Sequence, residues 1–148
     1  KILHRTRCKE MKLYTEKILK LATEIPHIGK IEKADRVVSL RSPICGSSIV
    51  VYINKVSGRI HEFKQEVKAC ALGQASASIL AKNVIGLDLL GISTLHSCVK
   101  DMLEKNLSAP PPPFSNYELL RPAVEFKNRH ASIMLALDAT RNALQDDS

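Results

Sequence analysis

Two cysteines occupy positions at which thiols commonly do chemistry. Cys45 lies in the stretch Ser-Pro-Ile-Cys-Gly-Ser-Ser, residues 42–48, a proline-to-glycine turn directly before a β-branched run. Cys70 lies in Lys-Ala-Cys-Ala-Leu-Gly-Gln, residues 68–74, where an alternating pattern gives way to a helical one. A thiol at the start of a helix feels the positive end of the helix dipole, which favours the thiolate, the form that attacks and binds metals. These two residues are the first candidates for a chemical site.

The spacing of the two cysteines carries little information by itself. They are far apart in the sequence and neither belongs to a CxxC chelate, so each could equally be a small buried hydrophobe. Cys98, within an apolar helical pattern, is predicted to be a buried thiol, and Cys8 lies in a basic N-terminal stretch, residues 1–10, that we expect to be frayed. Four such cysteines do not indicate a disulfide framework.

Composition narrows the classes of function. The chain has 148 residues and a net charge of +7, which predicts one domain, residues 1–148, with acidic partners. Three tyrosines, three phenylalanines and no tryptophan supply few stacking platforms, so specific nucleic-acid binding is not expected. No apolar run reaches the ~18 residues of a membrane span, and no signal peptide is visible, which favours a cytoplasmic protein without membrane contact. No phosphate-binding loop, HExxH or GxSxG motif occurs.

The elements that must position the cysteines follow from hydrophobic periodicity. Alternation and β-branched residues predict strands over 36–41, 48–54 and 59–67, the last two joined by a turn at Lys55-Val56-Ser57-Gly58. Four consecutive prolines, residues 110–113, predict an extended, solvated connector. Helix followed by strands and then helices indicates an α+β domain, a three-stranded antiparallel sheet with about five helices on one face. The predicted helices cover residues 9–25, 71–83, 87–104, 117–124 and 126–144.

The two cysteine segments closely resemble those of the IscU-type, or NifU N-terminal, iron–sulfur cluster assembly scaffolds. In that family a Cys-Gly-Asp turn precedes a strand, and a Cys-Ala-x-x-x-Ala-Ser-x-Ser helix start follows about 25 residues later. Here the first motif falls on Cys45 and the second on Cys70 to Ser78, and the resemblance runs from about Leu13 to Leu144. It implies the SufE/NifU-like fold, a three-stranded antiparallel sheet packed by helices.

Two departures from the family pattern concern the ligands themselves. Ser47 replaces the aspartate that, in the family, tunes cluster release. The third family cysteine falls on Ala131 or Ser132 and is therefore missing, as in a bacterial branch that carries Arg-His-Ala-Ser at this position. His130 offers an imidazole beside that position, and a Cys₂His set with an open fourth site can bind Zn²⁺. The resemblance therefore implies Cys45, Cys70 and His130 as ligands of a transient iron–sulfur cluster or of zinc.

The leading hypothesis is a non-catalytic carrier that assembles iron and sulfide and hands the cluster on. The resemblance implies a cysteine desulfurase, an iron donor and acceptor apoproteins as partners. The alternative is a SufE-like persulfide acceptor, a sulfurtransferase that works through a single reactive thiol. A third hypothesis is an interaction module that has kept the fold and lost the chemistry.

Overall fold

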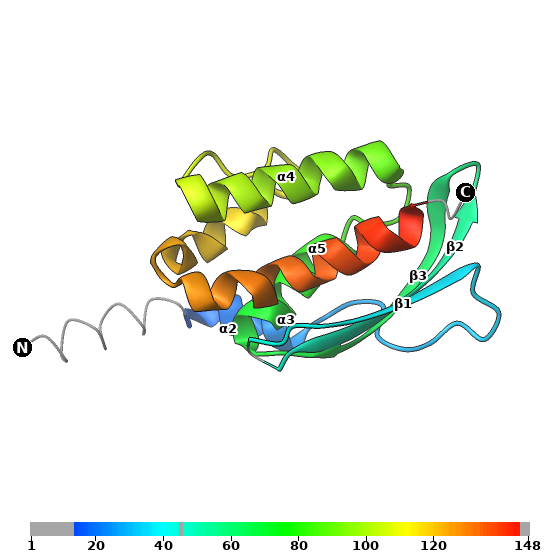
Figure 1. The fold of residues 1–148 in the computed structure, drawn as a ribbon, viewed down its shortest axis with the longest axis horizontal. Coiled ribbons are helices and arrows are strands. Elements are labelled where there is room, and N and C mark those ends of the chain that lie inside the picture. The colour runs from blue at the N-terminus through cyan, green and yellow to red at the C-terminus, as the bar shows by residue number, and fades with distance from the viewer. Residues whose placement is uncertain (1–13, 45, 146–148) are drawn as a thin grey trace, which may run out of the picture.

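A computed structural model describes residues 14–44 and 46–145, which form an antiparallel sheet with helices packed on one face (Figure 1). This confirms the α+β class and the three-stranded sheet. Residues 1–10, for which a frayed basic terminus was predicted, lie outside the described residues. The elements in chain order are α2 (Glu16–Thr23), β1 (Arg36–Arg41), β2 (Ser48–Val56), β3 (Arg59–Lys68), α3 (Ala71–Ala81), α4 (Leu89–Lys105), the 3₁₀ helices η1 (Ser115–Glu125) and η2 (Lys127–Arg129), and α5 (His130–Leu144).

The sheet is a meander with strand order β1-β2-β3. Strand β2 pairs antiparallel with both neighbours, and the turn between β2 and β3 has positive φ at Ser57 and Gly58 (54° and 77°), as a tight hairpin requires. Because side chains alternate between the two faces of a strand, one face of the sheet is the core face. Its side chains are Val38, Leu40, Ile49, Val51, Ile53, Phe63, Gln65 and Val67.

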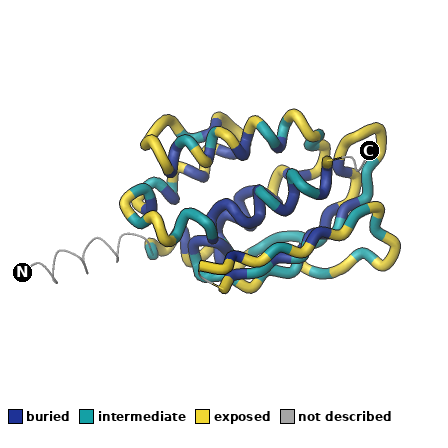
Figure 2. The backbone as a smooth tube through the Cα atoms, in the orientation of Figure 1, coloured by how far each residue is buried: buried dark blue, intermediate teal, exposed yellow. Residues whose placement is uncertain are grey.

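The helices form two layers over that face (Figures 1 and 2). Helix α5 packs on β1 and β2, α3 packs on β3, and α2 lies against α3. Helix α4 packs on α5 as an outer layer and also contacts η1. Helices α3 and α5 are buried along most of their length, which Figure 2 shows as dark blue, because they lie between the sheet and the other helices. Helices α3 and α5 are therefore packed against each other inside the molecule.

Several boundaries differ from the sequence prediction for local reasons. Helix α2 starts after Thr15, whose hydroxyl caps it by accepting from the Ile18 amide, and residues 9–13 of the predicted helix lie outside the described residues. The proline connector was predicted to be fully solvated, but Pro110 is buried. Pro122 lies inside η1, where the looser backbone bonding of a 3₁₀ turn accommodates it. None of the helices within the described residues is long and apolar enough to span a bilayer.

Candidate functional site

Three small polar side chains from distant parts of the chain meet where α3 begins. The Ser132 Oγ lies 3.3 Å from the Cys70 Sγ and 3.2 Å from the Ser47 Oγ. Ser132 and Ser47 are buried, at 1% and 4% exposure, whereas Cys70 is half-buried. The hydroxyl of Ser132 therefore links the thiol at the surface to the turn that leads into β2.

Cys70 is placed by its position at the N-cap of α3. Its backbone is extended (φ −66°, ψ 169°) and its carbonyl accepts the Gln74 amide at 2.9 Å, so the residue begins the helix two positions after β3 ends at Lys68. Its side chain makes no capping hydrogen bond, which leaves the sulfur directed to other partners. The sequence prediction of a thiol at a helix start after a strand is confirmed.

Ser47 is held by a closed turn between β1 and β2. The Ser42 amide donates to the Ser47 carbonyl at 2.8 Å, and the Gly46 amide donates to the Ser42 carbonyl at 2.9 Å. Gly46 has φ +72°, a conformation that glycine adopts without strain. Cys45, the other predicted thiol ligand, lies outside the described residues, and its neighbours in the turn are described on both sides.

Gly73 allows α3 and α5 to approach each other beside the thiol. A Cβ atom at this position would lie 2.4 Å from the Ser132 Oγ and 3.0 Å from the Ser132 carbonyl oxygen. It would also lie 2.9 Å from the Cβ of Ala69. Glycine is therefore required at position 73 by the close packing of α3 against α5.

A buried hydrogen-bond network fixes α3 against α5 one turn further on. The Ser76 hydroxyl donates to the Ile133 carbonyl at 2.6 Å, and the Tyr117 hydroxyl donates to the Ser76 carbonyl at 3.0 Å. Tyr117 is fully buried, and burial raises the pKa of its hydroxyl, an effect that the hydrogen bond with Ser76 partly offsets. This network explains why the second motif carries a serine at position 76.

The structure distinguishes the two possible positions of the missing third cysteine. Both Ala131 and Ser132 belong to the first turn of α5, but it is the Ser132 side chain that meets Cys70. The sequence placed the missing third cysteine on Ala131 or Ser132 and did not predict the contact of Ser132 with Ser47. The signal in the sequence was that the resemblance implies functional residues at the position of Ser47 and at that of Ala131 or Ser132.

His130, the third predicted ligand, begins α5 and is half-buried. Its Nε2 lies 2.8 Å from the Ala123 carbonyl oxygen, and because a carbonyl only accepts, this nitrogen donates. The Nδ1 is then the ring nitrogen with a lone pair to offer. Within residues 14–44 and 46–145, no three His, Cys, Asp or Glu side chains gather closely enough to hold a metal ion. The ligand set of Cys45, Cys70 and His130 therefore stays a prediction.

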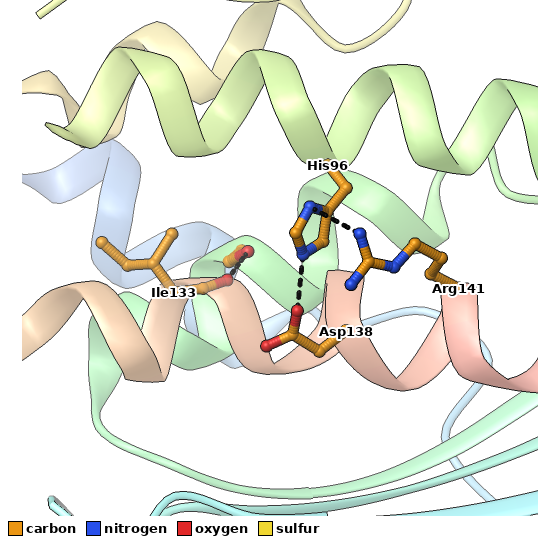
Figure 3. A network of polar contacts seen from close by, with 5 residues as sticks. His96, Ile133, Asp138 and Arg141 are labelled. Atoms are coloured by element: carbon orange, nitrogen blue, oxygen red, sulfur yellow. Dashed lines mark hydrogen bonds and ion pairs between the residues drawn. The ribbon is translucent and has the colours of Figure 1, made fainter. Parts of the chain in front are cut away.

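A second polar cluster joins α4 to α5 (Figure 3). The buried ring of His96 contacts Asp138 through Nε2 at 2.5 Å and Arg141 through Nδ1 at 3.2 Å. A guanidinium only donates, so Nδ1 accepts from Arg141 and Nε2 carries the proton that is shared with Asp138. The Asp138 carboxylate is half-exposed although it is bonded to a buried histidine. These two contacts link α4 to α5.

Comparison with known proteins assigns the chain to a family. Residues 13–146 match the NifU-like N terminal domain family, and the chain belongs to that family. A crystal structure of a nitrogen-fixing NifU-like protein (N-terminal) from Brucella abortus is 35% identical and superimposes with a TM-score of 0.88, covering 92% of this chain and 94% of the other. The family match over residues 13–146 includes α3 and α5, the two helices that contribute to the thiol site.

Other relatives match over shorter stretches or at lower identity. The iron–sulfur cluster assembly scaffold proteins IscU of Thermotoga maritima and IscU 1 of Archaeoglobus fulgidus are 31% and 30% identical over 74 residues, 50% of this chain. The chain spans about half the length of these curated relatives, 52% and 48%. A putative SUF-system scaffold protein from Fervidobacterium islandicum is 21% identical, with a TM-score of 0.79 over 90% of this chain and 97% of the other, which shows a shared fold.

Proposed function

We propose that this chain is a carrier on which iron and sulfide are assembled and from which they pass to acceptor proteins. Family membership supports this function, since both curated relatives described above are named as cluster assembly scaffolds. The single observation that carries it is the contact of Ser132 with both Cys70 and Ser47. This contact joins the turn of the first motif to the helix start of the second.

The proposal takes Cys45 as the second thiolate. Cys45 is two positions before Ser47 in the sequence. The Ser47 hydroxyl contacts the Ser132 hydroxyl, which in turn contacts the Cys70 sulfur. Two thiolates that share a cargo must lie close together, and Cys45 and Cys70 are the pair that the proposal requires.

His130 is proposed as the third ligand. Histidines that bind metals usually donate their other ring N–H to a carbonyl or carboxylate, which orients the ring. The bond from His130 Nε2 to Ala123 is of this kind and leaves Nδ1 to bind. Two thiolates and an imidazole form an incomplete set for a cluster, so the cargo would exchange readily, and the same set accepts a zinc ion. The partners would be a cysteine desulfurase, an iron donor and acceptor apoproteins, in a cytoplasmic setting.

Anaerobic purification tests the proposal, with iron, zinc and acid-labile sulfide measured on the intact chain. Cys45→Ser and Cys70→Ser should each lose most of the bound metal or sulfide, because each removes one of two thiolates. Cys98→Ser is the matched control, since Cys98 is a half-buried thiol on α4 whose sulfur contacts the Ser108 carbonyl. Its metal content should equal that of the unmodified chain.

Two results would contradict the carrier function. If the metal and sulfide contents do not depend on Cys70, then Cys70 does not bind the cargo and the proposed site is wrong. Incubation with a desulfurase and cysteine that adds one sulfur atom to Cys70, seen by mass spectrometry without any bound iron or zinc, would favour the persulfide acceptor instead. In that exchange the thiol of Cys70 takes the outer sulfur of the desulfurase persulfide, and the desulfurase cysteine leaves as a thiol.

A further inference from the structure

A pocket of about 330 Å³ lies away from the thiol site, where α2, the end of α3 and η1 meet. Helix α2 contributes Lys17 and Lys20, its C-cap is Glu24, the C-cap of α3 is Lys82, and η1 contributes Asn116. Lys82 is twelve residues beyond Cys70, and at 1.5 Å per residue this places the two about 18 Å apart along the helix axis. The pocket is thus a separate surface of the molecule.

The pocket carries an excess of positive charge. Among the described residues, none of the ammonium groups of Lys17, Lys20 and Lys82 has an acidic partner within ion-pair distance. Glu24 is the one acidic side chain in the lining and follows Lys20 by one helical turn. Three cations against one anion leave a local charge of +2, which fits the basic balance of the whole chain.

The pocket lining also contains apolar side chains. Leu21 is 6% exposed and Leu119 of η1 is half-buried, and both line the pocket together with the lysines. Lysine side chains can lay their methylene stems along apolar surface while their charges stay in water. The lining therefore combines apolar surface with positive charge.

We propose that this pocket binds an acidic segment of a partner protein, with glutamate or aspartate side chains as the occupants. A glutamate can lay its methylene groups on Leu21 and Leu119 and reach a lysine with its carboxylate. The alternative of a compact phosphate fits less well. The lining contains no arginine fork, and α3 contributes its C-terminus, the negative end of the helix dipole, which disfavours an anion with concentrated charge. An acidic segment carries several carboxylates at separate positions, and these can reach the separate lysines of α2 and of the end of α3.

An acidic partner segment also agrees with the known effect of charged surfaces on protein association. Complementary charge raises the rate of encounter and orients the partner more than it adds affinity. An acidic segment on this pocket would hold a partner while leaving Cys70 and its surroundings open. The proposal depends on the lysines alone and holds whatever cargo the thiol site carries.

The test uses the full chain labelled with ¹⁵N and titrated with a blocked hexaglutamate peptide at low salt, followed by amide chemical shifts. The shifts should concentrate on Lys17, Lys20, Lys82 and Asn116. Lys20→Gln and Lys82→Gln should each weaken binding by about two- to fivefold, the range of exposed ion pairs. Glu24→Gln should strengthen it by about twofold, because it removes the one competing carboxylate.

Lys100→Gln is the matched control, since Lys100 is exposed on α4, does not line the pocket, and its loss changes the net charge equally. It should leave the affinity unchanged, and so should Cys70→Ser, which alters only the separate thiol site. Equal weakening by Lys100→Gln would overturn the proposal in favour of a net-charge effect. Inorganic phosphate that shifts the same amides more strongly at equal ionic strength, or phosphatidylserine vesicles that bind through these lysines when the peptide does not, would also overturn it.

Discussion

The Ser132 hydroxyl lies 3.3 Å from the sulfur of Cys70, although the two residues are 62 positions apart in the sequence. The same hydroxyl contacts Ser47, 85 positions away from it. The family resemblance implies an aspartate at the position of Ser47 and a cysteine at that of Ala131 or Ser132. Three segments of the chain thus meet at the Ser132 hydroxyl, and two of them contribute hydroxyl groups.

Restoring a thiol at position 132 should strengthen cargo binding. In Ser132→Cys the new sulfur would start from a Cβ that already directs its substituent at Cys70, so both sulfurs could bind one metal. We expect several-fold more iron and acid-labile sulfide, or zinc, to remain after anaerobic reconstitution and desalting. Ser132→Ala, which removes the hydroxyl without adding a ligand, should not show this gain. Equal retention by the cysteine and alanine variants would mean that position 132 does not face the cargo.

Gly73→Ala should destabilise the fold at the site. The added Cβ would meet the Ser132 Oγ at 2.4 Å and the Ser132 carbonyl oxygen at 3.0 Å, and backbone cannot move aside as a flexible side chain can. Overpacking of this kind costs about 1–3 kcal/mol, more than the gain of up to ~1 kcal/mol from replacing a helical glycine. Urea unfolding measures the loss, with Gln74→Ala, a half-buried neighbour in the same turn, as control. A stability equal to or above that of the unmodified chain would contradict the close approach.

Tyr117 should make the fold sensitive to alkaline pH. Burial raises the pKa of its hydroxyl above the ordinary value, so the folded state keeps a proton that the unfolded state loses. The stability this provides is complete below about pH 10 and declines as pH rises further, by up to about 1.4 kcal/mol per pH unit. Urea unfolding between about pH 8 and pH 11 should show a steeper decline for the unmodified chain than for Tyr117→Phe. If the unfolding free energies of the two proteins decline in parallel, then folding does not raise the pKa of the Tyr117 hydroxyl.

Loss of the carboxylate beside His96 should loosen the contact between α4 and α5. Asp138→Ala removes the acceptor of the Nε2 proton, and His96 is only 6% exposed, so water replaces the lost partner poorly. A hydrogen bond to a charged group contributes about 1.5–3 kcal/mol, and we expect a destabilisation in that range by urea unfolding. Asp101→Ala is the control, because Asp101 forms an exposed pair with Lys105 at 3.8 Å, worth about 0.5 kcal/mol or less. If both variants lose similar amounts of unfolding free energy, then the contact of Asp138 with His96 stabilises the fold no more than an exposed ion pair does.

Much of the fold follows from patterns that are local in the sequence. Alternation placed strands at 36–41, 48–54 and 59–67, within two residues of β1, β2 and β3. The helix beginning after Cys70 and the turn before β2 were likewise predicted correctly, because a change of period and a proline-to-glycine turn act over a few residues. The helix boundaries around the prolines were less accurate, since burial of Pro110 and the 3₁₀ form of η1 depend on packing.

The sequence by itself determined which residues could do chemistry and in which local setting each stands: a thiol at a helix start, another in a turn, and a missing third cysteine. Only the tertiary structure decided that Ser132 rather than Ala131 meets Cys70, that Ser47 joins them, and that His96 bonds to Asp138. The physical reason is that these contacts depend on how closely and at what angle helices cross. At α3 and α5 the absence of a side chain on Gly73 sets that approach, and its consequence appears 59 residues away, at Ser132.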